Sequence, residues 1–136
     1  MKEICFRISL ALTLLTPTGG VAARPHAAQG TLLWQQNLNG TANGFGDAAL
    51  SVAVDNQGNV VAAGTTLNTG TFVDFTVAKF DRDGTLLWQQ TLNGTAPNSF
   101  DEALSVAVDN QGNVVAAGFT QNAGGNDDFT VAKFDR

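Results

Sequence analysis

Apolar and polar residues alternate in short blocks along most of the chain. From about residue 30 onward, runs rich in Val, Phe, Leu and Thr are separated by clusters of Gly, Asn and Asp, which is typical of strands and turns. No segment there keeps an apolar period of 3.6 residues for three helical turns. The pattern therefore predicts an all-β fold, whose first four strands lie at residues 49–55, 60–66, 74–81 and 85–92.

These blocks occur twice. The stretch VDNQGNVVAAG occupies residues 54–64 and recurs unchanged at 108–118, and residues 30–83 align with 84–136 at a constant offset of 54. Such self-similarity predicts a repeat architecture. The chain opens with the fourth strand of a unit, at residues 31–38, and ends after a third strand. Ring closure by strand sharing would require this order.

Short polar segments join the predicted strands. In each unit an Asp, a Gly and an Asn form a turn, because the Gly can adopt positive φ and the polar side chains can bond nearby amides. These turn residues are Asp55, Gly58 and Asn59, and Asp109, Gly112 and Asn113. Gly64 and Gly118 lie inside strands, where a glycine indicates a bulge or a close approach of a neighbouring backbone.

A lone four-stranded sheet with apolar residues on both faces cannot bury them, whereas sheets stacked around an axis can. That is the principle of the β-propeller. The motif D-x-A-x-S-x-A-V-D-x-x-G-N-V-x-x-A-G-x-T, followed by D-F-x-V-A-K-F-D-x-D-G-T-x-x-W, runs from Asp47 to Trp88 and starts again at Asp101. It resembles the SBBP-type bacterial β-propeller repeat, which is close to the delta-60 repeat. The resemblance implies two four-stranded antiparallel propeller blades in a secreted or surface-attached protein, with a structural or binding role.

Proteins of that family usually carry enough repeats to close a ring in one chain, and this chain has two. With only two blades, each blade would have one face covered by the other and one face bare. Three alternatives follow for the bare faces. About three or four chains could assemble into a ring of roughly six or eight blades. The chain could be part of a longer gene product, or the two sheets could form a sandwich. The expected partners are thus further blades, identical chains or an extracellular ligand.

Residues 1–23 have the organisation of a secretory signal peptide. Lys2 and Arg7 precede a short apolar run, and the sequence Val21-Ala22-Ala23 suits a signal peptidase. A cut after Ala28 fits as well, and residues 24–29 would form a linker. The run is shorter than the roughly 20 residues that span a bilayer. We expect a secreted, periplasmic or cell-surface protein without a membrane span after removal of the signal.

Composition narrows the chemistry further. Cys5 is the only cysteine and lies in the predicted leader, and His26, the only histidine, would be lost with the longer cut. Without them, a mature chain has no Cys nucleophile, Cys/His zinc site or His general base. The net charge is −5 and the seven basic residues do not cluster, so nucleic acid is not an expected partner. We predict no catalytic residue, cofactor or metal ligand.

Two motifs allow a second interpretation. The segment Asp-Arg-Asp-Gly at 81–84 is similar to part of a calcium loop, but Leu92 stands where such a loop needs a bidentate Glu, so a turn is favoured. Trp34 and Trp88 resemble the docking tryptophan of quinone-dependent dehydrogenase propellers, which makes a fragment of a propeller enzyme (quinoprotein, hydrolase or lyase) the alternative function. Packing between blades explains both tryptophans more simply.

Two polar features also have structural explanations. Lys79 and Lys133 lie in apolar strands, where each would extend to a rim or pair with a carboxylate such as Asp74 or Asp128. The sequons at 39–41 and 93–95 are interpreted as turns.

Differences between the repeats point to candidate contacts. They cluster at residues 43–48 against 97–102, and at 65–73 against 119–127. Because loops carry recognition on a constant scaffold, we predict a contact surface formed by Phe119, Gln121, Asn122, Asn126, Asp127 and Asp128. The predicted function is a non-catalytic binding or structural module, and a self-assembling ring subunit without a ligand is a further alternative.

Overall fold

The computed structural model describes residues 30–44 and 46–136. The predicted signal peptide at 1–23 and linker at 24–29 lie outside the described residues. The chain divides between Thr31 and Leu32, and the unit Leu32–Arg136 contains every strand of the described part. No described residue is helical, so the prediction of an all-β fold is confirmed.

The first sheet is an antiparallel meander of four strands. Its strands are β1 (Ala48–Val54), β2 (Val60–Asn68), β3 (Phe72–Phe80) and β4 (Leu86–Leu92), in that order across the sheet. All four lie within two residues of their predicted ends. A short strand that the sequence pattern did not reveal, β5 (Ser99–Phe100), pairs parallel to β3.

The second sheet contains β6 (Glu102–Val108), β7 (Val114–Gln121) and β8 (Asp127–Phe134), again in sequence order and antiparallel. The description as two four-stranded blades is therefore wrong for this sheet, whereas the prediction that the second repeat ends after a third strand agrees with it. In the described part of the chain, no strand pairs with the outer edge of β8, so the equivalent of β4 is missing here.

The strand predicted at residues 31–38 is also absent, since this segment has no strand structure. A strand requires a hydrogen-bonded neighbour, and the described residues provide none for this segment. It is nevertheless attached to the first sheet. The Trp34 ring lies 6.1 Å from that of Phe80, and its Nε1 donates a 3.1 Å hydrogen bond to the carbonyl oxygen of Arg82.

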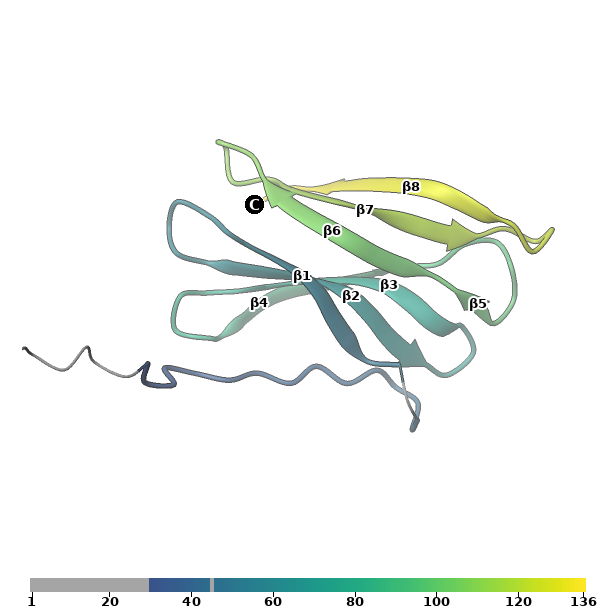
Figure 1. Ribbon diagram of the computed structural model, residues 1–136, viewed down its shortest axis with the longest axis horizontal. Helices are drawn as coiled ribbons and strands as arrows, with labels where there is room; N and C mark the ends of the chain where they lie inside the picture. The colour runs from purple at the N-terminus through teal and green to yellow at the C-terminus, as the bar shows by residue number, and fades with distance from the viewer. Residues whose placement is uncertain (1–29, 45) are drawn as a thin grey trace, which may run out of the picture. The chain divides into compact units, whose positions relative to one another are not determined.

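The two sheets are stacked face to face, with β6 lying over β1, β2 and β3 (Figure 1). The core between them consists of small and branched side chains and one aromatic ring: Val61, Ala63, Phe75 and Val77 from the first sheet, and Ala103, Val106, Val114 and Ala116 from the second. They alternate with a period of two along β2, β3 and β7. Along β6, Ala103 and Val106 are three residues apart because the register shifts between Ala103 and Ser105. Burial of these apolar side chains is the main source of stability for the pair.

The repeats agree in detail as well as in outline. In both sheets the register of the first strand pair shifts at the same place, between Ala49 and Ser51 and between Ala103 and Ser105. Gly64 and Gly118 face these bulges. A Cβ on Gly64 would overlap the carbonyl oxygen of Ala48, and one on Gly118 would overlap that of Glu102. Both glycines therefore permit a close backbone approach, as their position predicted.

We expect the substitution Gly64→Ala to lower the free energy of unfolding by about 3 kcal/mol, because the new methyl group must displace backbone rather than a flexible side chain. Gly70→Ala is the control. Gly70 has φ +90°, and no atom lies within 4 Å of the position that the methyl group would take, so only the backbone cost of about 1 kcal/mol applies. Urea unfolding measures both, and equal losses would contradict this explanation of Gly64.

Candidate functional site

Hydrogen bonds accepted by one aspartate organise each turn between the first two strands of a unit. Asp55 Oδ1 accepts bonds from the amides of Gln57 and Asn59, each 2.9 Å long, and its Oδ2 accepts one of 2.8 Å from Asn59 Nδ2. Asp109 makes the same bonds with Gln111 and Asn113. The glycines of these turns, at positions 58 and 112, have φ of +84° and +86°. The carboxylate of each aspartate thus accepts bonds from the backbone of its own turn.

Each of these aspartates also pairs with a lysine. Lys79 Nζ lies 3.1 Å from Asp55 Oδ2, with both side chains buried, and Lys133 Nζ lies 2.8 Å from Asp109 Oδ2 in a more exposed pair. The expected pairing with Asp74 or Asp128 is wrong. Asp74 is five residues from Lys79 along β3, and an odd separation places the two side chains on opposite faces of the sheet.

The ionisation of Asp55 reflects this environment. Burial opposes the charged form and raises its pKa, but the hydrogen bonds from Asn59, Lys79 and Gln57 outweigh it and lower the pKa from 3.8 to about 2. The pKa of Asp109 is lowered as well, chiefly by its hydrogen bond from Lys133. Asp55 is therefore ionised at neutral pH and serves as an ion-pair partner and turn acceptor.

Where the two sheets stack, these turns line a polar cavity of about 460 Å³. Its walls include Asp55, Lys79, Asn110, Gln111 and Arg136. Because the carboxylate and the ammonium group are already paired with each other, the cavity offers mainly amide groups to a ligand. Among the residues that the structure describes, no three His, Cys, Asp or Glu side chains are grouped to hold a metal ion.

The residues predicted as contacts lie at one end of the second sheet. Phe119, in β7, stacks on Phe100 of β5 with ring centroids 6.2 Å apart and planes 19° apart. Because β5 pairs with β3, this aromatic pair links the two sheets. Gly46 and Thr65 stand at the equivalent positions of the first repeat, where the Thr65 hydroxyl donates to the Gly46 carbonyl oxygen.

The other predicted contacts lie in or beside the turn between β7 and β8: Gln121 ends β7, Asn122 and Asn126 are in the turn, and Asp127 and Asp128 begin β8. Asn122 Oδ1 accepts bonds from the amides of Gly124 and Asn126, and its Nδ2 donates a 2.9 Å bond to Asp128. The amide of Gln121 donates to Asp101, whose carboxylate is buried. Asn126, Asp127 and Asp128 are exposed. The structure thus brings these residues together around one turn, and any recognition by them remains a prediction.

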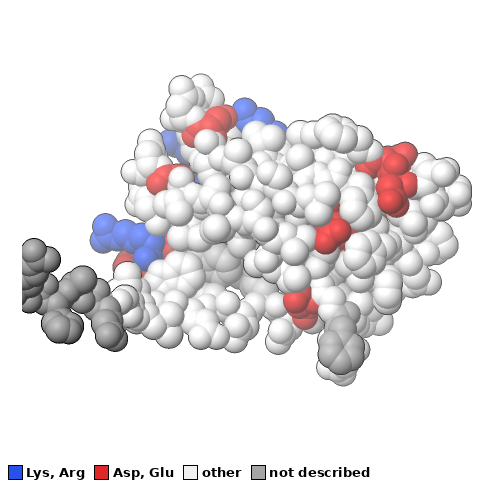
Figure 2. Space-filling model, viewed as in Figure 1, with Lys and Arg blue, Asp and Glu red and all other residues white. Residues whose placement is uncertain are grey.

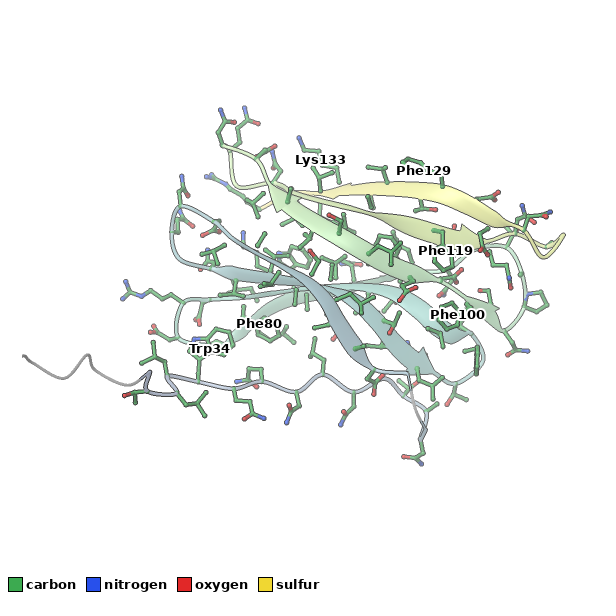
Figure 3. All side chains as sticks on the ribbon, viewed as in Figure 1. Trp34, Phe80, Phe100, Phe119, Phe129 and Lys133 are labelled. Carbon is green, nitrogen blue, oxygen red and sulfur yellow. The ribbon has the colours of Figure 1, made fainter. Side chains whose placement is uncertain are left out.

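The most unusual surface is the outer face of the second sheet. Phe75 is fully buried, whereas its equivalent Phe129 is 88% exposed, and Val131 is exposed where Val77 is fully buried. Figure 3 shows Phe129 and Lys133 on the side of β8 that faces away from the first sheet. Identical residues are therefore covered in one sheet and bare in the other. We call Phe129, Val131 and the unpaired edge of β8 the open face.

A second incomplete surface lies on the opposite side of the first sheet. A groove of about 470 Å³ separates residues 36–39 from that sheet and is lined by Ala49, Ala62, Gly64 and Thr66, among others. The rings of Trp34 and Phe80 stand together at one end of this segment (Figure 3). Sequence reasoning predicted bare faces but not this groove. Its signal was the match between LLWQQNL at 32–38 and LLWQQTL at 86–92.

Charge plays a small part in these surfaces. On the side of the molecule shown in Figure 2, acidic and basic side chains form a few small groups separated by broad uncharged areas. No helix in the described ranges is long and apolar enough to cross a membrane.

Comparison with known proteins adds no relative: no model of a protein family matches the chain, and no curated protein matches it. The class defined by the fold is an all-β protein of two stacked sheets with antiparallel meanders. Within that class, the distinguishing features are the 54-residue repeat and the two incomplete surfaces.

The turn aspartates predict an acid dependence of stability. Because the folded-state pKa of Asp55 is lowered to about 2, its contribution to stability is complete above pH 3.8 and is lost as the pH falls toward 2. Asp55→Asn should lower stability at pH 7 and make its decline between about pH 4 and pH 2 shallower. Urea unfolding across this range measures both effects. Asp83→Asn, at an exposed side chain, is the control, and an unchanged slope in Asp55→Asn would contradict the assignment.

Proposed function

We propose that this chain is a non-catalytic repeat module of the β-propeller type, which acts as a structural or binding unit outside the cytoplasm. Its two sheets are successive blades. The observation that carries the proposal is the agreement of the two sheets in register, bulge position and turn bonding. Units that agree in this way can stack repeatedly with one geometry, as repeat proteins do.

The contacts between the sheets support the same proposal. The Trp88 ring, in the outer strand of the first sheet, lies 5.6 Å from the ring of Phe134 in the second sheet, and the equivalent pair of Trp34 and Phe80 is separated by 6.1 Å. The amide of Val106 donates a 3.2 Å bond to Ser51 Oγ, which joins the first strands of the two sheets. Neighbouring units thus make contacts at both edges, as a further blade would need.

A chain with one more unit tests the stacking. Insertion of a second copy of residues 30–83 before Gly84 should give a folded three-sheet protein. Its denaturant m-value should rise to about 1.5 times that of the original chain, because m scales with the surface exposed on unfolding. The control is the same insertion carrying Asp at the position of Phe75, which cannot be buried between sheets. An m-value that the extra unit does not raise would mean that two sheets form a closed pair.

Export is tested separately. When the chain is expressed from Met1 in a bacterium, the product recovered outside the cytoplasm should have the mass of a chain that begins at Arg24 or Gln29. Intact mass spectrometry of the secreted fraction measures this. A full-length product confined to the cytoplasm would contradict the proposed location but would leave the stacking of the blades unaffected.

A further inference from the structure

We infer that the open face binds a second copy of this chain, which adds its residues 32–38 to β8 as an antiparallel strand and covers Phe129 and Val131 with its first sheet. The inference rests on the proposed function, because it treats the two sheets as successive units of one stack. It names the partner of those units and the residues that meet.

The chain itself contains the template for the strand pairing. β4 pairs antiparallel with β3, with Phe75 opposite Leu92, Val77 opposite Gln90 and Lys79 opposite Trp88. Residues 32–38 differ from 86–92 at one position, Asn37 in place of Thr91, and β8 repeats the sequence of β3 from Asp128 to Phe134. Applied to β8, the 54-residue offset places Phe129 opposite Leu38, Val131 opposite Gln36 and Lys133 opposite Trp34.

The face contacts follow from the same offset. Phe75 belongs to one buried cluster with Ala103, Val106 and Ala116 of the second sheet. Two of their equivalents on the first sheet, Ala49 and Ala62, line the 470 Å³ groove. The third, Val52, is 66% exposed, whereas Val106 is 8% exposed. The chain therefore presents both halves of one interface, and the halves are complementary because the same residues already pack together inside it.

Two polar contacts are completed in the same way. Within the chain, Ser51 Oγ accepts a bond from the amide of Val106, and the carbonyl oxygen of Val73 accepts one of 2.8 Å from the amide of Asp101. Between copies, the 54-residue offset predicts two equivalent hydrogen bonds. The amide of Val52 in one copy would donate to Ser105 Oγ of the other, and the amide of Asp47 would donate to the carbonyl oxygen of Asp127. The second of these contacts falls within the predicted contact surface of the β7–β8 turn.

The added strand is held in place before the copies meet. Trp34 packs on Phe80 as Trp88 packs on Phe134, so the same ring contact that joins β4 to the second sheet joins residues 32–38 to the first sheet. In Figure 1, this segment and the second sheet are on opposite sides of the first sheet. The β8 edge of the same chain is therefore not its neighbour, and the strand must pair with the β8 edge of another copy.

The resulting contact joins two different surfaces, so copies associate head to tail and either close into a ring or continue as a filament. Propeller rings contain about four to eight blades, which corresponds to roughly two to four copies of a two-blade chain. Burial of exposed apolar side chains, together with a row of main-chain hydrogen bonds, is the driving force for such strand addition.

Light scattering coupled to size exclusion of the exported chain tests the assembly. The expected mass is at least twofold that of one chain, and Phe129→Asp should reduce it to one chain. Circular dichroism should still show the two folded sheets, with at most the loss of the added strand, because Phe129 is exposed within the chain. Leu104→Asp is the matched control. Leu104 is 52% exposed, and its equivalent Leu50 is still 47% exposed although the second sheet is stacked on the first. Stacking therefore does not cover this position, and Leu104→Asp should keep the mass of the assembly.

Disulfide trapping tests the register. One preparation carries Val131→Cys and the other Gln36→Cys, each with Cys5→Ser, and the two are mixed and mildly oxidised. A covalent pair of chains on a non-reducing gel is expected, since directly opposed strand residues lie within disulfide reach. Leu38→Cys in place of Gln36→Cys is the control. It is displaced by two residues on the same face and should cross-link at least several-fold less.

These outcomes separate the inference from the proposed function. A single-chain mass, an unchanged mass in Phe129→Asp, or equal trapping by Gln36→Cys and Leu38→Cys would overturn the inference. So would a chain carrying both Val131→Cys and Gln36→Cys that cross-links only within itself, because its own segment would then occupy β8. If the three-unit chain nevertheless folds with the larger m-value, the proposed function as a repeat module is retained and only the self-assembly is rejected.

Discussion

The burial of one sheet face against another is the interaction on which the rest of this structure depends. Each sheet is apolar on both faces, and a single sheet of this size cannot bury either of them. Phe75 and Val77 are buried because β6 and β7 lie over them. Stacking thus stabilises the first sheet and at the same time leaves an identical, uncovered face on the second. The repeat makes such an unmatched surface unavoidable in any open stack of two units.

The polar residues ensure that the faces match. In each unit one aspartate bonds to two turn amides and a lysine, and one in-strand glycine permits a bulge. These interactions set the twist and register of the sheets in the same way twice. Because registers agree, side chains that pack between the sheets here would pack equally well between further sheets. One difference between the repeats lies at the end of the sheets beside β5, where Phe100 and Phe119 replace Gly46 and Thr65.

Much of this architecture could be predicted from local patterns. The four strands of the first sheet lie within two residues of their predicted ends, and the turns at Asp55 and Asp109 form as their residues indicated. Lys79 was assigned the wrong carboxylate because its partner, Asp55, lies in the turn between β1 and β2, far from Lys79 in the sequence. The parallel strand β5 has two residues and no alternation to detect. The groove beside residues 36–39 depends on how an unpaired segment lies on a sheet.

The amino-acid sequence by itself determined the strands, the turns and the repeat, because alternation, glycine backbone freedom and aspartate–amide bonds act over a few residues. Only the tertiary structure decided which copy of each face is covered. Phe75 and Phe129 stand in the same local sequence, DFTVAKFD, yet one is buried and the other exposed. Likewise, residues 32–38 and 86–92 are almost identical, but only the latter form a strand. The physical reason is that burial and strand pairing require a neighbour, and position in the stack determines which neighbours exist.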